Sequence, residues 1–457
     1  MINALITKYN KSAPRYTSYP PANHFTEEVN HKHFEKAVKE SNDFSPNHIS
    51  FYLHIPFCKK LCFYCGCNTC PLGKATQVEA YLSALKKELK TVIGLLDKSR
   101  KVSQIHFGGG TPNSIPAEAL HELNQMIFDA FALTEHAEIA IETNPAYLDR
   151  SYIEALKAAG FNRFSLGIQD FNKDVLKMVN RDPSALPVDE LMAMIKAGNP
   201  ANAINFDFIY GLPGQSVESF SQTIRQAANH RPDRLVTFSY AHLPSVFKSQ
   251  KILEKRGLPA SSLKVTLYET AAKILKDAGY KAIGMDHFVL PDDELYIALE
   301  QKKLHRNFQG YCTRETTGQV YAVGVSAISQ LEQAYIQNSK SVDDYIKRIN
   351  GMGSAAVKGY LLDRNEMLIR EAITELMCNK NLDLNNLASR RQLQLNNVLQ
   401  ALRINESELN EFINDGLLTF KNHHFQITDA GQLFIRNIAA SLDPLQQNPT
   451  RLYSQTV

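Results

Sequence analysis

Residues 48–67 read HISFYLHIPFCKKLCFYCGC, and this stretch decides the fold. Its first part, HISFYLHI, is rich in β-branched, aromatic and apolar residues, which predicts a buried strand. Cysteines follow at positions 58, 62 and 65, so the spacing C-x3-C-x2-C lies in the loop that leaves the strand. In barrels of alternating strands and helices, such loops carry the functional side chains. A site that uses thiols is therefore expected where this strand ends.

The same pattern continues downstream, from about residue 47 to residue 285. The strand-like runs are HISFYLHI, SQIHF, AEIAIE, RFSLGI, INFDFIY and RLVTFSY, and the amphipathic stretches are 76–98, 116–132, 149–159, 187–197, 216–228 and 261–278. Strict alternation of strand and helix predicts a parallel sheet with right-handed crossovers. Six units are fewer than the eight that close a full barrel. We therefore expect an α/β fold, an incomplete (β/α)6 TIM-like barrel that is open on one side.

The chain is expected to divide into four units. These are an N-terminal arm over 1–45, the partial barrel over 46–300, a connecting extension over 301–360, and a mostly helical C-terminal domain over 361–457. The C-terminal domain resembles a winged helix and contains a hairpin-like piece, GLLTFKNHHFQIT. Its basic and acidic residues are interspersed and form no basic stripe: Arg390, Arg391, Arg403, Arg436, Asp415 and Asp429. It is interpreted as a lid or docking domain.

Composition narrows the class of protein. The 457 residues carry a formal net charge of only +3, which disfavours a protein that coats nucleic acid or an anionic membrane. No apolar run reaches 18 residues, and the polar start MINALITKYNKSAPRY lacks a signal-peptide pattern, so a cytoplasmic protein is expected. Most of the seven cysteines fall between positions 58 and 70, which indicates a metal or catalytic site.

The cysteine spacing itself favours iron–sulfur chemistry. Ordinary structural clusters use four thiolates, whereas three can leave one iron open to a substrate. The alternatives are a zinc site or unrelated buried cysteines. Zinc pairs usually come as C-x2-C with a second distant pair, which this sequence lacks.

Motifs over nearly the whole chain carry a family resemblance: PRYTSYP, YLHIPFC, CGC, GGGTP, NRFSLGIQDFN, VNR, DFIYGLP, YAHLP, GMDHF, HRNFQGY and GVSAIS. Through them the sequence resembles the oxygen-independent coproporphyrinogen III oxidases of the radical S-adenosylmethionine (SAM) superfamily. The resemblance implies a [4Fe-4S] cluster on Cys58, Cys62 and Cys65, and SAM chelated at the open iron through its amino and carboxylate groups. It also implies that a second SAM molecule binds, and that one electron from the cluster cleaves the sulfonium to a 5′-deoxyadenosyl radical.

By the same resemblance, the activity would be oxidative decarboxylation of two propionates of coproporphyrinogen III, giving protoporphyrinogen IX in haem biosynthesis. An electron donor such as flavodoxin or ferredoxin would be a partner. We expect a monomer without nucleic-acid or membrane partners. The alternatives are a haem chaperone of the same superfamily, a radical SAM methylase or cyclopropanase, and a DNA-binding regulator. Cys67 and the PRYTSYP arm favour the oxidase over the chaperone.

Matching the family's motifs residue by residue gives candidate SAM contacts. Those to the first SAM are Tyr52, Gly109, Glu142 and Ile328; those to the second are Tyr64, Gly110, Thr111, Gln169, Arg181, Asp207 and Ala241. The residue types suit these roles, because carboxylates accept hydrogen bonds from hydroxyl or ammonium groups and arginine pairs with a carboxylate through a forked contact. Glycines let the backbone approach a ligand closely, although a lone GGG also fits a tight turn.

Further candidates are less specific. The family requires Cys67 for activity without using it as a cluster ligand, and the alternatives are a fourth ligand or a passive residue. Cationic or aromatic groups that could meet the substrate's carboxylates, or could be purely structural, are Arg15, Tyr16, Tyr19, His287, His305 and Arg306. Cys70 has no assigned role, and Cys312 and Cys378 are expected to be buried apolar residues.

Overall fold

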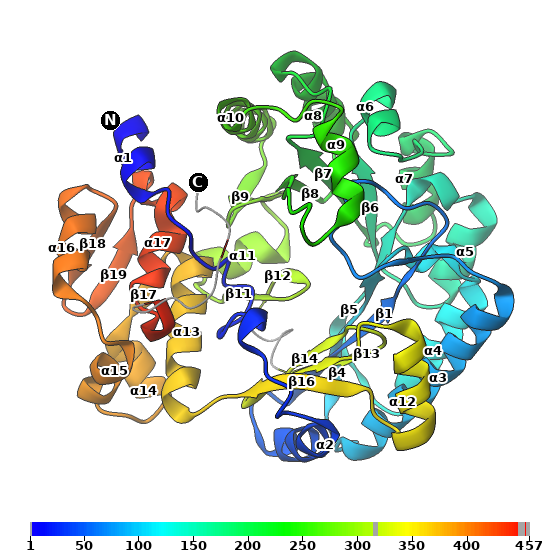
Figure 1. The fold of residues 1–457 in the computed structure, drawn as a ribbon, viewed down its shortest axis with the longest axis horizontal. Helices are drawn as coiled ribbons and strands as arrows, with labels where there is room; N and C mark the ends of the chain where they lie inside the picture. The colour runs from blue at the N-terminus through cyan, green and yellow to red at the C-terminus, as the bar shows by residue number, and fades with distance from the viewer. Residues whose placement is uncertain (1, 314–318, 447–452, 454–457) are drawn as a thin grey trace.

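Six strand-helix units build the larger body of the protein, as the computed structural model of residues 2–313, 319–446 and 453 shows (Figure 1). The strands are β1 (His48–Ile55), β4 (Lys101–Gly109), β5 (Leu133–Thr143), β6 (Arg163–Gln169), β7 (Ala203–Tyr210) and β8 (Arg234–Ser239). The helices that follow them in turn are α3 (Ala75–Leu95), α4 (Ala117–Phe128), α5 (Arg150–Ala158), α7 (Val188–Lys196), α8 (Val217–His230) and α10 (Ser261–Asp277). Two short helices, α6 (Lys173–Met178) and α9 (Lys251–Glu254), lie in the loops after β6 and β8.

These six strands are parallel neighbours in one sheet, in the order β1, β4, β5, β6, β7, β8. Beyond β8, the sheet continues antiparallel through β10 (His287–Val289) and β9 (Lys281–Ile283). On the other side of β1 lie β13 (Gln319–Val323), which is parallel to β1, and then β14 (Ile328–Gln330), β15 (Ala334–Asn338) and β16 (Ala356–Leu361). The prediction of an incomplete (β/α)6 barrel is confirmed.

Side chains along each strand point alternately to an apolar layer under the helices and to the polar interior of the barrel. Ile105, Phe107, Phe164 and Phe206 point toward the covering helices and are fully buried. Burial of each such side chain contributes about 2 kcal/mol, which explains why these runs are β-branched and aromatic. The residues between them face the barrel interior and are mostly polar.

The N-terminal arm is more regular than its sequence suggests. It contains α1 (Ile2–Tyr9) and α2 (His31–Glu40), and Figure 1 places α1 beside the C-terminal elements. The Tyr9 ring centroid lies 5.3 Å from that of Phe412, and the Tyr16 hydroxyl donates to Asp443 over 2.9 Å. Tyr19 is also buried among the C-terminal helices. These tyrosines therefore attach the arm to the C-terminal unit. This favours a structural role for Tyr16 and Tyr19 over contact with the substrate.

The C-terminal unit combines helices with a small sheet. Its elements are α13 (Arg364–Asn379), β17 (Asn381–Asp383), α14 (Leu384–Arg390), α15 (Leu395–Leu402), α16 (Glu406–Asn414), β18 (Leu418–Lys421), β19 (His424–Ile427) and α17 (Ile435–Ala440). The predicted hairpin is β18–β19. Arg390 and Arg391 are paired with Glu371, and Arg436 donates to the Pro14 carbonyl. These arginines are thus engaged within the protein.

Further short elements complete the fold. They include β2 (Phe57–Cys58), β3 (Cys70–Pro71), α11 (Glu294–Glu300), β11 (Leu304–Asn307), β12 (Gly310–Thr313) and α12 (Val342–Met352). Between 301 and 360, strands β13 to β16 lengthen the barrel sheet, and the division of the chain into four units remains a proposal. Within the described ranges, no helix has the length and apolar character needed to cross a membrane.

Candidate active site

A cavity of about 390 Å³ opens at the carboxyl ends of the parallel strands. Its walls are built mainly from every second residue of neighbouring strands, because alternate side chains of a strand point to the same face. These lining residues are Gln104 and His106 on β4, Glu138, Ala140 and Glu142 on β5, Arg163, Ser165, Gly167 and Gln169 on β6, Asn205, Asp207 and Ile209 on β7, and Arg234, Val236 and Phe238 on β8. The interior is therefore a polar wall with an opening toward the cysteine loop.

The cysteine loop closes one side of this cavity. Cys58 ends β2 and is buried, Cys62 and Cys65 are half-buried, Cys67 is exposed, and all of them line the cavity. Burial raises the pKa of Cys58 to about 11. The Cys67 thiol hydrogen bonds to Cys65, which lowers the pKa of Cys65 to about 6 and raises that of Cys67. The sequence prediction that these thiols share one site is consistent with this placement.

The thiols are held from outside by polar groups. The Thr111 hydroxyl donates to Cys58 Sγ over 3.4 Å, and Arg181 Nη1 donates to Cys62 Sγ over 3.6 Å. Among the described residues, no group of three or more His, Cys, Asp or Glu side chains is arranged to hold a metal ion. Geometry alone therefore does not name what the thiols bind.

The triple glycine after β4 packs the loop against its neighbours. Gly109 has φ +111°, a left-handed conformation that favours glycine, and a Cβ there would lie 2.5 Å from the His54 ring. A Cβ on Gly110 would lie 2.5 Å from the Pro56 carbonyl oxygen. Thr111 follows with its backbone N–H bonded to the Phe57 carbonyl. The glycines thus allow the loop to lie directly beside the cysteine loop.

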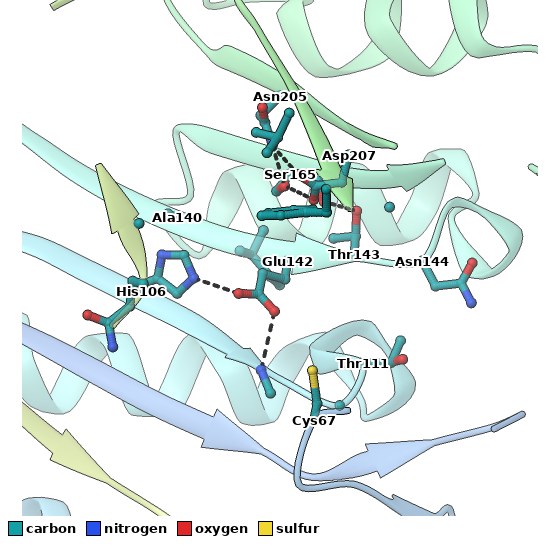
Figure 2. Close-up of a pocket in the computed structure, with 18 of the residues that line it drawn as sticks. Cys67, His106, Thr111, Ala140, Glu142, Thr143, Asn144, Ser165, Asn205 and Asp207 are labelled. Atoms are coloured by element: carbon teal, nitrogen blue, oxygen red, sulfur yellow. Dashed lines mark hydrogen bonds and ion pairs between the residues drawn. The ribbon is translucent and has the colours of Figure 1, made fainter. Parts of the chain in front are cut away.

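Glu142 projects into the cavity near the end of β5. His106 Nε2 lies 3.0 Å from Glu142 Oε1, and the Gly109 N–H donates to Glu142 Oε2 over 3.3 Å, as Figure 2 shows. Burial would raise the pKa of Glu142, but the His106 and Gly109 hydrogen bonds outweigh it and hold the pKa below its usual value. Glu142 is therefore a fixed carboxylate that can accept bonds from a ligand.

Asp207 forms the second carboxylate position, on β7. Ser165 Oγ donates to Asp207 Oδ2 over 2.6 Å, and Asn205 Nδ2 donates to Asp207 Oδ1 over 2.8 Å (Figure 2). Burial raises the pKa of Asp207 despite these bonds. Asn205 Oδ1 is buried and has no partner in the described part of the chain, so it is one acceptor that a ligand could satisfy.

Arg181 and Gln169 line the cavity near the end of β6. Arg181 donates to the Gly167 carbonyl, while its buried Nε has no partner among the residues that the structure describes. Gln169 ends β6 with φ +69°, and such outliers cluster at ligand sites. Tyr64 also lines this cavity. Most of the predicted SAM contacts are thus brought together here.

Three predicted contacts lie outside the cavity lining. Tyr52 stands next to it, since its ring is stacked on His106 with centroids 5.9 Å apart. Ala241 is exposed, and its carbonyl accepts from Gln250. Ile328 is half-buried in a small apolar cluster with Tyr335. Their assignment as SAM contacts, like that of the residues that line the cavity, remains a prediction.

Sequence reasoning missed several polar side chains of the site. His106, Ser165 and Asn205 position the predicted carboxylates, and Glu138 lies deeper, paired with Arg163 over 3.2 Å. Arg234 lies beside this pair and donates to Asp293 over 2.6 Å. For Ser165, Asn205 and Glu138 the signal was available, because each stands two or four positions from a recognised residue on the same strand.

The candidate carboxylate-binding groups are only partly at the cavity. His287 lines it and is bonded to Asp286 over 2.6 Å. Arg306 is half-buried and donates to the carbonyl of Arg15, whose side chain is exposed. His305 accepts from the Arg306 backbone N–H.

The remaining cysteines have simple surroundings. Cys70 belongs to the short strand β3, which pairs with β2 at the cysteine loop. Cys312 and Cys378 are buried, as expected, although Cys312 also reaches the cavity lining.

The donor set suits an iron–sulfur cluster with SAM. Three thiols face one cavity, which fits a cluster that leaves one iron for a small ligand. The unpartnered Nε of Arg181 and Oδ1 of Asn205 are a donor and an acceptor on the same walls, as an amino acid with a ribose requires.

The comparisons with known proteins agree with this site. Residues 52–227 match the Radical SAM superfamily, and residues 362–434 match the HemN C-terminal domain. The oxygen-independent coproporphyrinogen III oxidase of Synechocystis is 39% identical over 98% of this chain and 96% of its own, and that of Escherichia coli K12 is 37% identical with the same coverage. The solved structure of coproporphyrinogen III oxidase (HemN) from Escherichia coli, described as a Radical SAM enzyme, superposes with a TM-score of 0.86 at 36% identity over 97% of this chain and 98% of that one. The chain belongs to the family of oxygen-independent coproporphyrinogen III oxidases.

Proposed function

We propose that the protein converts coproporphyrinogen III to protoporphyrinogen IX without oxygen, by oxidative decarboxylation of two propionates in haem biosynthesis. One observation carries the proposal: the C-x3-C-x2-C thiols face the same cavity as the polar wall of β4 to β8. Curated relatives at 37% and 39% identity over nearly the full chain support it. The cofactors are a [4Fe-4S] cluster and SAM.

Residues at different positions in the cavity have different roles in the proposed reaction. Cys58, Cys62 and Cys65 would hold the cluster, which together with SAM would supply radical chemistry toward a propionate side chain. Glu142 and Asp207 accept hydrogen bonds from the polar groups of SAM. Arg181 pairs with a carboxylate through its forked guanidinium. The strand walls limit the access of water, which would otherwise compete for the reactive species.

Cys67 has a separate role in this proposal. It is exposed on the cysteine loop, and Figure 2 shows its sulfur beneath Glu142. A thiol at this place can give or accept a proton or hydrogen near the substrate without holding an iron. The family resemblance supports this assignment over a fourth ligand.

The proposal also includes the setting of the enzyme. We assign it a cytoplasmic location, the monomeric state, and a small electron donor such as flavodoxin or ferredoxin. The near-neutral composition and the absence of a basic stripe in the C-terminal domain support small-molecule and transient partners over nucleic acid.

Anaerobic reconstitution tests the function directly. The protein is loaded with iron and sulfide, then incubated with reductant, SAM and coproporphyrinogen III. We expect a brown protein, release of 5′-deoxyadenosine and carbon dioxide, and formation of protoporphyrinogen IX. Haem binding without conversion would identify a chaperone, and incorporation of a SAM-derived carbon without carbon dioxide would identify a methylase or cyclopropanase. Either result would overturn the proposal.

A further inference from the structure

Cations gather on the outer side of the cysteine loop. We name this surface the basic face, and its members are Lys59, Lys60, Lys177, Lys248, Lys251, Lys255 and Arg256. They come from three segments: the cysteine loop itself, the loop with α6 after β6, and the loop with α9 after β8. All of them are exposed except Lys60, which is half-buried.

Side-chain and backbone contacts join these three segments. Arg256 lies over the Phe63 ring at 5.1 Å and donates to the Lys177 carbonyl over 3.4 Å. Gln250 Nε2 donates to the Tyr64 carbonyl over 3.1 Å, and the Phe63 N–H donates to the Val179 carbonyl over 3.0 Å. The three segments that carry the basic face therefore lie against one another at the cysteine loop.

The charge of this patch is unbalanced. The acidic residues in the same segments are Asp174, Asp182, Glu254 and Asp170, of which Asp170 is buried. Asp182 is bonded to Lys60 over 2.7 Å, and Glu254 lies 2.9 Å from His242. The whole chain has a net charge of only +3, so the positive charge is concentrated here and is not a general property of the surface.

Apolar side chains stand among the cations. Leu61 is 37% exposed, Leu243 47%, Val246 65% and Ile252 37%. Large exposed apolar groups rimmed by charge mark surfaces that bind other proteins. Phe247 packs against Gly66, so the loop that carries Val246 rests on the cysteine loop.

We propose that the basic face docks a small acidic electron-carrier protein that donates one electron at a time to the cluster. In this step the carrier loses one electron and the cluster gains it, with no bond made or broken. Complementary charge accelerates encounter, while the apolar residues provide the contact. The inference rests on the proposed function, because in that function the reductive cleavage of SAM requires this electron.

Charge reversal on the basic face tests the proposal. The triple variant K248E/K251E/K255E is compared with K32E/K36E/K90E, which reverses exposed lysines on α2 and α3. Turnover is driven either by a flavodoxin of net negative charge, kept reduced by its reductase, or by dithionite. Binding of oxidised flavodoxin is followed separately by its flavin fluorescence at low and high salt, without regard to turnover.

For K248E/K251E/K255E we expect flavodoxin-driven kcat/KM at low salt to fall, and the Kd for flavodoxin to rise, by at least about tenfold. Dithionite-driven turnover should match that of the unmodified protein, and the α2/α3 variant should change little. Equal losses in both variants, or unchanged flavodoxin binding, would overturn the docking proposal. Binding of a short RNA at the basic face in preference to flavodoxin would also overturn it. Absence of dithionite-driven turnover in the unmodified protein would instead refute the proposed function.

Discussion

Two carboxylates on β5, four residues apart on one face of the same strand, have opposite surroundings. Glu138 is paired with Arg163, lies 4.0 Å from Arg234 and accepts from Gln104, and only 16% of its side chain is exposed. Glu142 is held by His106 and the Gly109 N–H, and 43% of its side chain is exposed. Burial acts on both, but nearby cations in one case and hydrogen bonds in the other keep each pKa below its usual value.

This difference separates two levels of the barrel. We call the level of Glu138 the floor, and the level of Glu142, near the carboxyl ends of the strands, the mouth. At the floor, carboxylates and guanidinium groups satisfy each other, so the charges stabilise the closed end and leave little for a ligand. At the mouth, the carboxylates are positioned by neutral or weakly basic groups, and buried polar atoms of Arg181 and Asn205 lack partners among the described residues. Arg181 and Asn205 both line the cavity, so a ligand bound there can satisfy these two atoms.

The largest effect is expected at the mouth, from the cysteines. Cys62→Ser should remove the cluster, because an iron loses its thiolate, and turnover should fall by more than about 1000-fold. Cys67→Ser should leave the visible absorption of the cluster unchanged and still abolish turnover. Absorption spectra, iron content and 5′-deoxyadenosine release measured anaerobically distinguish the two.

The matched control is Cys70→Ser, which changes a thiol on the same loop outside the cavity lining. It should retain the cluster and most of the activity. Loss of the cluster in Cys67→Ser would make Cys67 a ligand and would overturn its separate role.

The second prediction compares the floor with the mouth by neutralising one carboxylate at each. Glu138→Gln should lower the free energy of unfolding by about 3 kcal/mol, because it leaves the largely buried guanidinium of Arg163 without its charge partner. Glu142→Gln should leave stability nearly unchanged and reduce kcat/KM for SAM about 30-fold, through loss of a charge-assisted hydrogen bond. Denaturant unfolding and steady-state kinetics measure the two quantities.

The two variants are informative only as a pair. If Glu142→Gln destabilises the protein as much as Glu138→Gln does, then Glu142 belongs to the structural network and the distinction between floor and mouth is wrong.

Much of the fold was predictable because the periodic placement of apolar residues within each segment indicates its secondary structure. The run HISFYLHI coincides with β1, and the other five strand predictions fall within observed strands or extend one residue beyond. The helices of the arm were not predicted, although Asn30 caps α2 and Phe34 and Val38 form its buried face at helical spacing. The pairing of β13 with β1 was not predictable, since it joins segments far apart in the chain through a strand of five residues.

The site was predictable to the extent that chemistry follows spacing. The spacing of three cysteines identifies Cys58, Cys62 and Cys65. No spacing pattern identifies His106, Ser165 and Asn205, which matter because of the side chains that they contact. The period-two pattern along β4 to β8 would have placed them on the interior face. Which of them would contact Glu142 or Asp207 depends on the register between strands, which no single strand encodes.

Glu88 sharpens the comparison, because it is a buried carboxylate held only by neutral donors. Its oxygens accept from the Gly324 N–H, Asn338 and the Tyr345 hydroxyl, each over 2.7 Å. Burial raises its pKa to about 7 from an ordinary 4.5. The folded state therefore holds the proton more tightly, and this contribution to stability is present below pH 4.5 and lost as the pH rises through 7.

Between pH 5 and pH 7, the free energy of unfolding should lose roughly 2 kcal/mol to this group alone. Glu88→Gln keeps the size of the side chain and removes the titration, so its stability should vary less over the same interval. Urea unfolding of both proteins at several pH values checks the slope, and parallel curves would show that Glu88 does not carry the predicted pH dependence.

The smallest effect is expected on the exposed side of α12, the helix that also supplies Tyr345 to Glu88. Arg348 is bonded to Asp344 over 2.7 Å, but both side chains are more than one third exposed. Water screens such an i,i+4 pair, so Arg348→Ala should change the free energy of unfolding by no more than about 0.5 kcal/mol. Tyr345→Phe, three residues earlier, removes a buried donor to a carboxylate and should cost about 1 to 2 kcal/mol. Urea unfolding of the two variants therefore compares a charge pair in solvent with one neutral hydrogen bond in the interior; a larger loss in Arg348→Ala would mean that charge, and not burial, sets the energy of this helix.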